Sequence, residues 1–187
     1  MIGAGGLLGW HGLQGHPVTV VHITDGAGGD PGGRTEDIRA IRRREGAEAL
    51  RRLRLGEPRR WDFPDGSVPE HIPALVERLR ALFAEVQPAT LYSFWFGEAH
   101  RDHRAVGAAV VQAADALPPS CRCLLFGVNQ VPPGGTLFDT SEVQALKRHA
   151  CEAYASQLAY IDFAKLSEHR DRAATVNIDT GNVTYAE

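Results

Sequence analysis

Strand-like and helix-like hydrophobic patterns alternate along the chain. Runs rich in β-branched and aromatic residues, typical of buried strands, cover residues 17–24 and 90–96, and residues 123–128 form a third predicted strand. Helical spacing of apolar residues is found at residues 7–13, 36–55, 72–83, 104–116 and 141–160. Residues 25–33 are predicted to form a glycine-rich loop and residues 58–69 to be irregular. After Phe163 the apolar residues lose clear periodicity, and a short strand is predicted at residues 175–178. Strands that alternate with helices predict an α/β fold with a mainly parallel sheet flanked by helices.

Size and charge narrow the class of protein. A chain of 187 residues without a linker or repeat fits one domain, which we expect to span residues 1–187. The 20 basic and 23 acidic residues give a net charge of -3, so there is no electrostatic reason to expect a nucleic-acid partner. We find neither an apolar stretch of about 20 residues nor a leader pattern, so we expect no membrane span and a cytoplasmic location. Cys121, Cys123 and Cys151 are expected to be buried, reduced thiols.

Two histidines follow the strand predicted at residues 90–96. His100 and His103 lie where this strand meets the next helix, and such junctions at the carboxyl ends of strands bind ligands in open α/β sheets. The two imidazoles can therefore converge on one small site. The alternative is that Asp102 caps the helix and that both histidines are exposed polar residues of a loop.

Carboxylates near these histidines offer a possible metal site. Asp25 ends the strand at residues 17–24, on the same sheet edge as His100 and His103 if the strands are parallel, and Asp30 and Glu98 lie in neighbouring loops. A site of Asp25 with the two histidines is conceivable, but aspartates at strand ends more often form turns. The glycines at residues 3–6 do not complete a dinucleotide fingerprint, because position 8 is a leucine and no strand precedes them.

Several short motifs, taken in order, resemble those of the PIG-L/LmbE-like deacetylases. They are Gly3-Ala4-Gly5-Gly6, Gly15 to Val21, Thr24-Asp25-Gly26, Arg42 with Glu45, the H-x-D-H-R-A-V-G of residues 100–107, and Lys147 with Tyr154-Ala155-Ser156-Gln157. Members of this family are zinc-dependent N-deacetylases of N-acetylglucosamine conjugates and related acylated amines. The resemblance therefore implies a three-layer, Rossmann-like fold and a zinc-dependent hydrolase that removes an N-acetyl or other N-acyl group from a small amino-sugar conjugate.

The resemblance also implies roles for individual residues. His103 matches the family's metal-binding histidine, and His100 matches the histidine that assists the tetrahedral intermediate or protonates the leaving amine. Arg42 matches an arginine that contacts substrate. Asp102 is expected to fix the loop and to orient a neighbouring imidazole. Lys147, Tyr154 and Gln157 have helical spacing, and we interpret them as one structural face of the last helix.

Two departures from the family pattern matter. Arg101 stands where the family's H-P-D-H motif has proline. The family also begins with a strand that ends in P-H-P-D-D-E, which supplies a metal histidine, a metal aspartate and the aspartate that acts as general base, and Met1-Ile2-Gly3 aligns just beyond it. We therefore expect an N-terminally truncated domain without its first strand, in which zinc is held weakly and activity is in doubt. The alternative is a non-catalytic protein that keeps the fold and a sugar-conjugate binding site.

Overall fold

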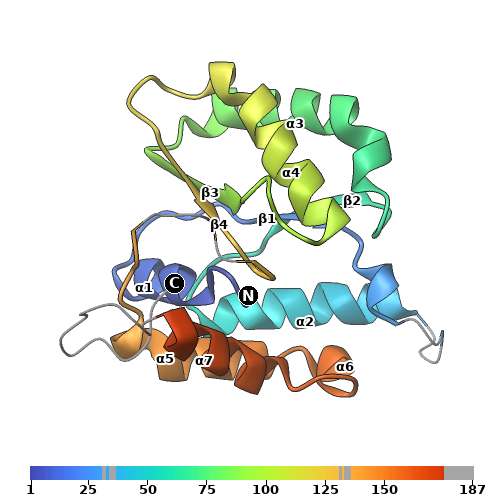
Figure 1. The fold of residues 1–187 in the computed structure, drawn as a ribbon, viewed down its shortest axis with the longest axis vertical. Helices are drawn as coiled ribbons and strands as arrows, with labels where there is room; N and C mark the ends of the chain where they lie inside the picture. Colours follow the sequence, from blue (N-terminus) through green and yellow to red (C-terminus); the bar gives the residue numbers. More distant parts are fainter. Residues whose placement is uncertain (31–32, 34–36, 131, 133–135, 175–187) are drawn as a thin grey trace. The chain divides into compact units, whose positions relative to one another are not determined.

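The computed structural model describes residues 1–30, 33, 37–130, 132 and 136–174, and these form two compact units (Figure 1). The first unit comprises the described parts of residues 1–62 and 136–187, and the second comprises those of residues 63–135. The strand predicted at residues 175–178 lies outside the described residues. That the whole chain forms one domain stays a prediction.

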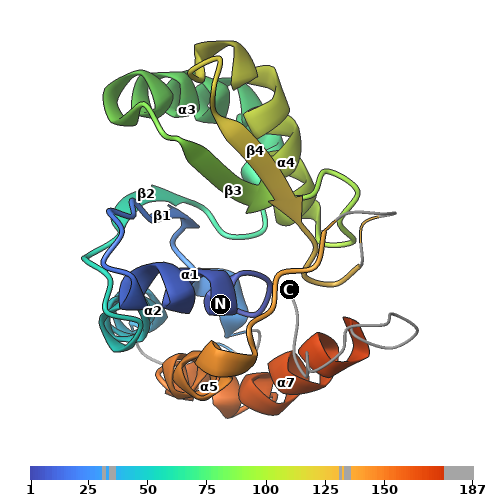
Figure 2. The same ribbon diagram turned by 90° about the vertical axis from the view of Figure 1, so that its left-hand side faces the viewer.

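Helices dominate the first unit. Its elements are α1 (Gly5–Leu13), β1 (Val21–Thr24), η1 (Ala27–Gly29), α2 (Ile38–Arg52), β2 (Arg59–Phe63, which ends at the boundary), η4 (Ser141–Val143), α5 (Gln144–Cys151), α6 (Ala155–Leu158) and α7 (Phe163–Ala174). Helix α5 packs against α1, α2 and α7, and in both views it lies beside α7 (Figures 1 and 2). Leu50, Leu53 and Ala150 form part of the fully buried apolar core. Apolar burial at these helix contacts supplies most of the unit's stability.

The last predicted helix is wrong as a single element. Instead of one helix over residues 141–160, the chain forms η4, α5 and α6, with a break at residues 152–154. The cause is a long-range contact, because Glu45 of α2 accepts hydrogen bonds from the backbone N and the Oγ of Ser156 at 2.7 and 2.6 Å. A carboxylate bound to an amide in the first turn of α6 favours a new helix start there.

Helix α7 was not predicted, since residues beyond Phe163 lack apolar periodicity. The buried residues of α7 are Ala164, Ser167 and Asp171, which have helical spacing but include two polar side chains. A search for apolar periodicity therefore misses this buried face. The start of the helix is stabilised by Asp162, whose carboxylate accepts a hydrogen bond from the Lys165 N–H at 2.9 Å.

The predictions for the two strands of the first unit also need correction. The strand expected over residues 17–24 is shorter, because β1 begins only at Val21. Its partner β2 lies within residues 58–69, which were predicted to be irregular. The N–H of Arg59, the first residue of β2, donates to the carbonyl of Val20, the residue before β1, at 2.8 Å. The sequence of β2, Arg-Arg-Trp-Asp-Phe, is too polar to show a strand pattern without its partner.

A parallel pair of strands with helices packed on it forms the second unit. Its elements are η2 (Val68–His71), α3 (Ile72–Val86), β3 (Thr90–Phe94), α4 (Arg101–Gln112), η3 (Ala114–Ala116) and β4 (Arg122–Phe126). Strands β3 and β4 run in the same direction, with Phe94 opposite Phe126 (Figure 2). Helix α4 packs against β3 and α3. The α/β fold class with parallel strands is confirmed.

Close packing of α4 on β3 requires a glycine. A Cβ atom at Gly107 would lie 2.5 Å from the Phe94 carbonyl oxygen and 2.8 Å from the Phe96 nitrogen. Helix α4 begins three residues before its predicted start at residue 104, so His103 lies in its first turn.

Among the described residues, no helix is both long and apolar enough to cross a membrane.

Candidate functional site

His100 caps the N-terminus of α4 with its imidazole. Its backbone is extended, with φ -70° and ψ 126°, and its Nδ1 accepts a hydrogen bond from the Asp102 N–H at 3.2 Å. An imidazole nitrogen that accepts a hydrogen bond carries no proton, so the proton of the neutral His100 ring is on Nε2. His100 therefore presents an N–H donor.

The His103 ring is held on two sides. It stacks on Phe94 with 4.1 Å between ring centroids and 1° between ring planes. Its Nδ1 lies 3.2 Å from the Glu98 Oε2. The His100 and His103 rings are neighbours, with their centroids 4.6 Å apart. The structure thus brings together the two histidines that the sequence predicts.

Glu98 is the buried carboxylate beside His103, and it is fully inaccessible to solvent. It accepts hydrogen bonds from the backbone N–H groups of Val128 at 2.6 Å, Asn129 at 3.0 Å and Gln130 at 3.2 Å, and from the Asn129 Nδ2 at 3.0 Å. Burial alone would raise the pKa of Glu98, but these donors and His103 together hold its pKa below the ordinary value. The ionised carboxylate can only accept, so Nδ1 of His103 carries the proton.

The contacts of the two imidazoles therefore indicate opposite tautomers. Burial lowers the pKa of His103 more than Glu98 raises it, so this ring is neutral near pH 7. His103 presents an unprotonated Nε2, which can bind a metal ion or accept a proton. His100 presents an Nε2–H, which can stabilise an oxyanion or protonate a leaving group.

Asp102 holds a loop rather than an imidazole. Its carboxylate accepts hydrogen bonds from the backbone N–H groups of Gly66 at 2.6 Å and Val68 at 3.2 Å. The prediction that Asp102 fixes a loop is confirmed, whereas the prediction that its side chain orients a neighbouring imidazole is wrong. The carboxylate that faces an imidazole is that of Glu98. Its position five residues before His103 was the available signal, but its hydrogen-bond partners lie some 30 residues further along the chain.

Arg42 lies in a buried polar cluster of the first unit, which we call the Arg42 cluster and which consists of Arg42, Glu45, Ser156, Gln157 and the Gly29 carbonyl. The Arg42 Nη2 donates to the Gly29 carbonyl at 3.0 Å, and Nη1 lies 3.5 Å from the Glu45 Oε2. With its amide oxygen turned toward the guanidinium, Gln157 accepts from both Nη atoms. The Arg42 side chain is only 8% exposed. Its predicted contact with substrate is not tested by this geometry and stays a prediction.

The strand-end aspartate Asp25 has turn-forming contacts. Its Oδ1 accepts from the Ala27 N–H at 3.0 Å, and its Oδ2 lies 2.8 Å from the Arg39 Nε. Asp30 accepts a hydrogen bond from the Tyr160 hydroxyl at 2.6 Å. Within the described ranges, no group of three His, Cys, Asp or Glu side chains is placed to hold a metal ion. The site of Asp25, His100 and His103 stays a prediction, because Asp25 belongs to the first unit and the two histidines to the second.

The three residues assigned to one face of the last helix lie on separate elements. Lys147 of α5 is 1% exposed and donates to Asp171 at 2.7 Å and to the Ile2 carbonyl at 3.0 Å. Tyr154 lies between α5 and α6, and burial is the main cause that raises its pKa to about 12. Gln157 belongs to the Arg42 cluster. Their contacts are internal, as a structural role predicts, although no single helix carries them.

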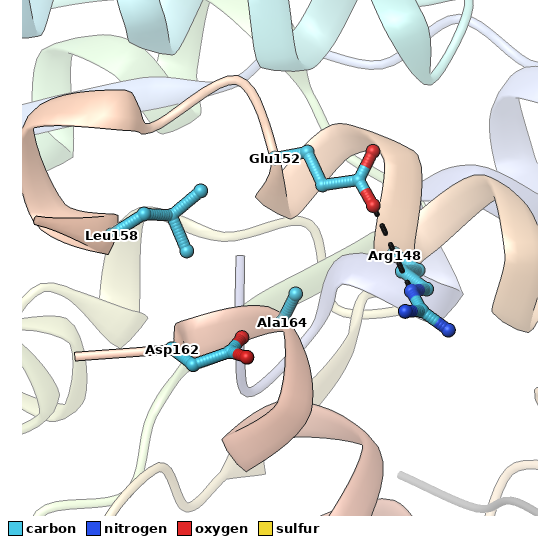
Figure 3. A pocket seen from close by; sticks show the side chains of 5 residues that line it. All are labelled: Arg148, Glu152, Leu158, Asp162 and Ala164. Carbon is cyan, nitrogen blue, oxygen red and sulfur yellow. Dashed lines mark ion pairs between the residues drawn. The ribbon is translucent and has the colours of Figure 1, made fainter.

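A shallow hollow of about 320 Å³ also lies in the first unit. It is lined by Arg148, Glu152, Leu158, Asp162 and Ala164. Arg148 and Glu152 form an ion pair across one side of it, 3.7 Å between Nε and Oε1 (Figure 3). None of the predicted site residues lines the hollow, so the histidines remain the best candidate site.

Comparisons with known proteins agree with the motifs. The family model described as PIG-L, GlcNAc-PI de-N-acetylase, matches residues 1–114. A probable N-acetyl-alpha-D-glucosaminyl L-malate deacetylase 2 of Bacillus anthracis is 28% identical over 157 residues, which cover 76% of this chain and 70% of that protein.

Solved structures share the fold over the whole chain. A conserved protein of Thermus thermophilus superposes with a TM-score of 0.83 at 21% identity, covering 100% of this chain and 86% of its own. The N,N'-diacetylchitobiose deacetylase of Pyrococcus horikoshii gives a TM-score of 0.78 at 20% identity, covering 100% and 76%. These likenesses establish the three-layer, Rossmann-like fold. Because the PIG-L family model matches more than half of its length, this chain belongs to the PIG-L family of de-N-acetylases.

Proposed function

We propose that this protein is a zinc-dependent N-deacetylase that hydrolyses the acetamide of an N-acetylglucosamine-type conjugate. In this proposal His103 is a metal ligand, His100 is a catalytic residue and Arg42 binds substrate. The observation that carries the proposal is the difference between the contacts of the two rings: Nδ1 of His100 accepts from a backbone N–H, whereas Nδ1 of His103 faces the Glu98 carboxylate. We infer opposite tautomers from these contacts. One ring then offers a lone pair, and its neighbour offers a proton.

Amide hydrolysis needs both of these groups. Water adds to the acetamide carbonyl and gives a tetrahedral intermediate, which collapses to acetate and a free amine once the nitrogen is protonated. The Nε2–H of His100 can donate a hydrogen bond to the developing oxyanion or a proton to the leaving nitrogen. The small molecule recognised is thus an N-acylated amino sugar on a carrier, as the Bacillus anthracis relative's name describes for that protein.

The described residues fit one ligand of a metal centre. A ligating histidine usually donates its other ring N–H to a carboxylate, as Nδ1 of His103 does to Glu98. A catalytic zinc site normally has three protein ligands, and within the described ranges no group of three candidate side chains is assembled. Bound zinc would lower the pKa of its water to about 7. We therefore expect weakly held zinc, well below one ion per chain after dialysis.

The lack of a three-ligand group in the described part of the chain also favours a second candidate. A protein with this fold could bind a sugar conjugate without hydrolysing it. We propose a cytoplasmic location for either function, because Cys121, Cys123 and Cys151 form no disulfide bonds. The prediction that all three are buried is wrong, since Cys123 is exposed and Cys121 is half-buried.

Acetate release separates the two candidates. The chain is incubated with N-acetylglucosaminyl malate, with and without added ZnCl₂, and acetate is measured together with calorimetric binding of the conjugate. Release that requires added zinc and stops with a chelator supports the deacetylase. Saturable binding without release supports the binding protein, and the absence of both overturns both candidates.

A further inference from the structure

Glu98 joins two segments of the second unit that are distant in sequence. Its carboxylate faces Nδ1 of His103 at one end and accepts the backbone N–H groups of residues 128–130, which follow β4. A fully buried charge is costly unless hydrogen bonds replace its hydration. The backbone donors and the Asn129 amide supply these bonds, so internal donors face both oxygens of the side chain that lies beside His103.

Stacking and hydrogen bonding restrict the His103 ring in different ways. Stacking on Phe94, with the ring planes at 1°, fixes the plane of the imidazole but not which edge faces Glu98. A 180° flip of the ring about its Cβ–Cγ bond would keep this plane but would replace Nδ1 by Cδ2 and break the bond to Glu98. Only the carboxylate therefore decides which nitrogen carries the proton.

We propose that Glu98 is the positioning residue of this site, fixing His103 as the Nδ1–H tautomer and coupling that choice to the loop at residues 128–130. This inference deepens the proposed function and rests on it for its chemical meaning. Glu98 acts through His103, since its two oxygens are occupied by internal donors. The result is an Nε2 lone pair with a fixed direction.

A glutamine at this position cannot replace the carboxylate. The backbone N–H groups of Val128 and Gln130 donate to Oε1, while Asn129 Nδ2 and His103 face Oε2. A glutamine amide has one oxygen and one NH₂ group, so its NH₂ must face donors on one side. Three backbone N–H groups face Oε1, so the glutamine oxygen should take that side and its NH₂ should face His103, which favours an unprotonated Nδ1.

The test reads the tautomer directly, without metal or substrate. Two-bond ¹H–¹⁵N correlation spectra of the chain labelled at its histidine rings distinguish Nδ1–H from Nε2–H imidazoles at near-neutral pH, and His103→Ala identifies the signal. We expect Nδ1–H in the wild type, a shift toward Nε2–H in Glu98→Gln, and no change in Asn129→Ala, which removes one donor to Glu98 but keeps the contact with His103.

Several outcomes would overturn the inference. An Nε2–H tautomer of His103 in the wild type does so, even if every variant fails to fold. An unchanged Nδ1–H signal in a folded Glu98→Gln variant does so too, and so does loss of that signal in Asn129→Ala, because the loop rather than the carboxylate would then set the tautomer. None of these spectra depends on deacetylation, so a failure here is distinct from a failure of the acetate assay.

Discussion

Charged side chains are used differently in the Arg42 cluster and in the histidine site formed by Glu98, His100 and His103. In the Arg42 cluster both Nη atoms of the guanidinium face internal acceptors, and both Glu45 oxygens face Ser156. In the histidine site, the hydrogen-bond contacts among the described residues engage Nδ1 of each ring and not Nε2. The difference teaches that a buried polar network either closes on itself, which holds segments together, or leaves one atom of each group for chemistry.

Breaking the buried ion pair of Lys147 and Asp171 should cause the largest loss of stability among the variants of the first unit. Asp171→Ala should lower the free energy of unfolding by about 3–5 kcal/mol, because Lys147 stays buried without its carboxylate. Urea denaturation measures this loss. Glu152→Ala is the control, since the Glu152 side chain is 48% exposed and its pair with Arg148 should contribute at most about 1 kcal/mol. Equal losses in both variants would contradict this account.

The free energy of unfolding, measured as a function of pH, tests the burial of His22, which is not part of the histidine site. Burial is the main cause that lowers the pKa of His22 to about 4, with smaller contributions from the N-terminus and Arg60 and an opposing one from Glu57. The unfolded chain therefore binds a proton between about pH 6.5 and pH 4 that the folded chain does not. The stability that neutral His22 contributes is present above pH 6.5 and is lost as the pH falls toward 4.

The loss should reach about 3 kcal/mol at most, at about 1.4 kcal/mol for each unit of pKa shift. In His22→Gln this part of the pH dependence should disappear. The exposed His149 provides the control variant His149→Gln, which should keep it. A curve for His22→Gln that is as steep as that of the wild type would contradict the assignment.

Gly107→Ala tests how closely α4 must approach β3 to hold the histidine site. The added Cβ would lie 2.5 Å from the Phe94 carbonyl oxygen, so we expect a loss of about 2 kcal/mol although alanine is the better helix former. Phe94 stacks on His103, so turnover should fall as well. Gly56→Ala, where a Cβ meets nothing within 4 Å, is the thermal-melting control. A Gly107→Ala variant with wild-type stability would mean that the two elements do not pack this closely.

Arg101→Pro should have the smallest effect. Arg101 is the first residue of α4, where proline is well accepted, and His100 before it already has the extended backbone that a following proline requires. The variant loses only an exposed ion pair with Glu70. We expect a change below about 1 kcal/mol in denaturation and no change in acetate release. A large loss of either would show that Arg101 itself shapes the site.

Local patterns predicted much of the fold and part of the site. The periodicity around β3 and α4 placed His100 and His103 at a strand-to-helix junction, because both signals lie within a few residues. The contact of Glu98 with residues 128–130 and that of Glu45 with Ser156 join positions far apart in the chain, so no local pattern reveals them. Helix α7 was missed because Ser167 and Asp171 are part of its buried face. Long-range polar contacts are thus what sequence reasoning lacked.

The most direct test measures zinc content and acetate release together in wild type, His103→Ala and His100→Asn with added zinc. Asparagine is a good N-cap, so it keeps the start of α4 while it removes the imidazole. We predict that His103→Ala loses both metal and turnover, whereas His100→Asn keeps the metal and turns over roughly 10²–10⁴-fold more slowly. Loss of metal in His100→Asn and its retention in His103→Ala would reverse the two roles, and full activity in both variants would contradict the deacetylase assignment.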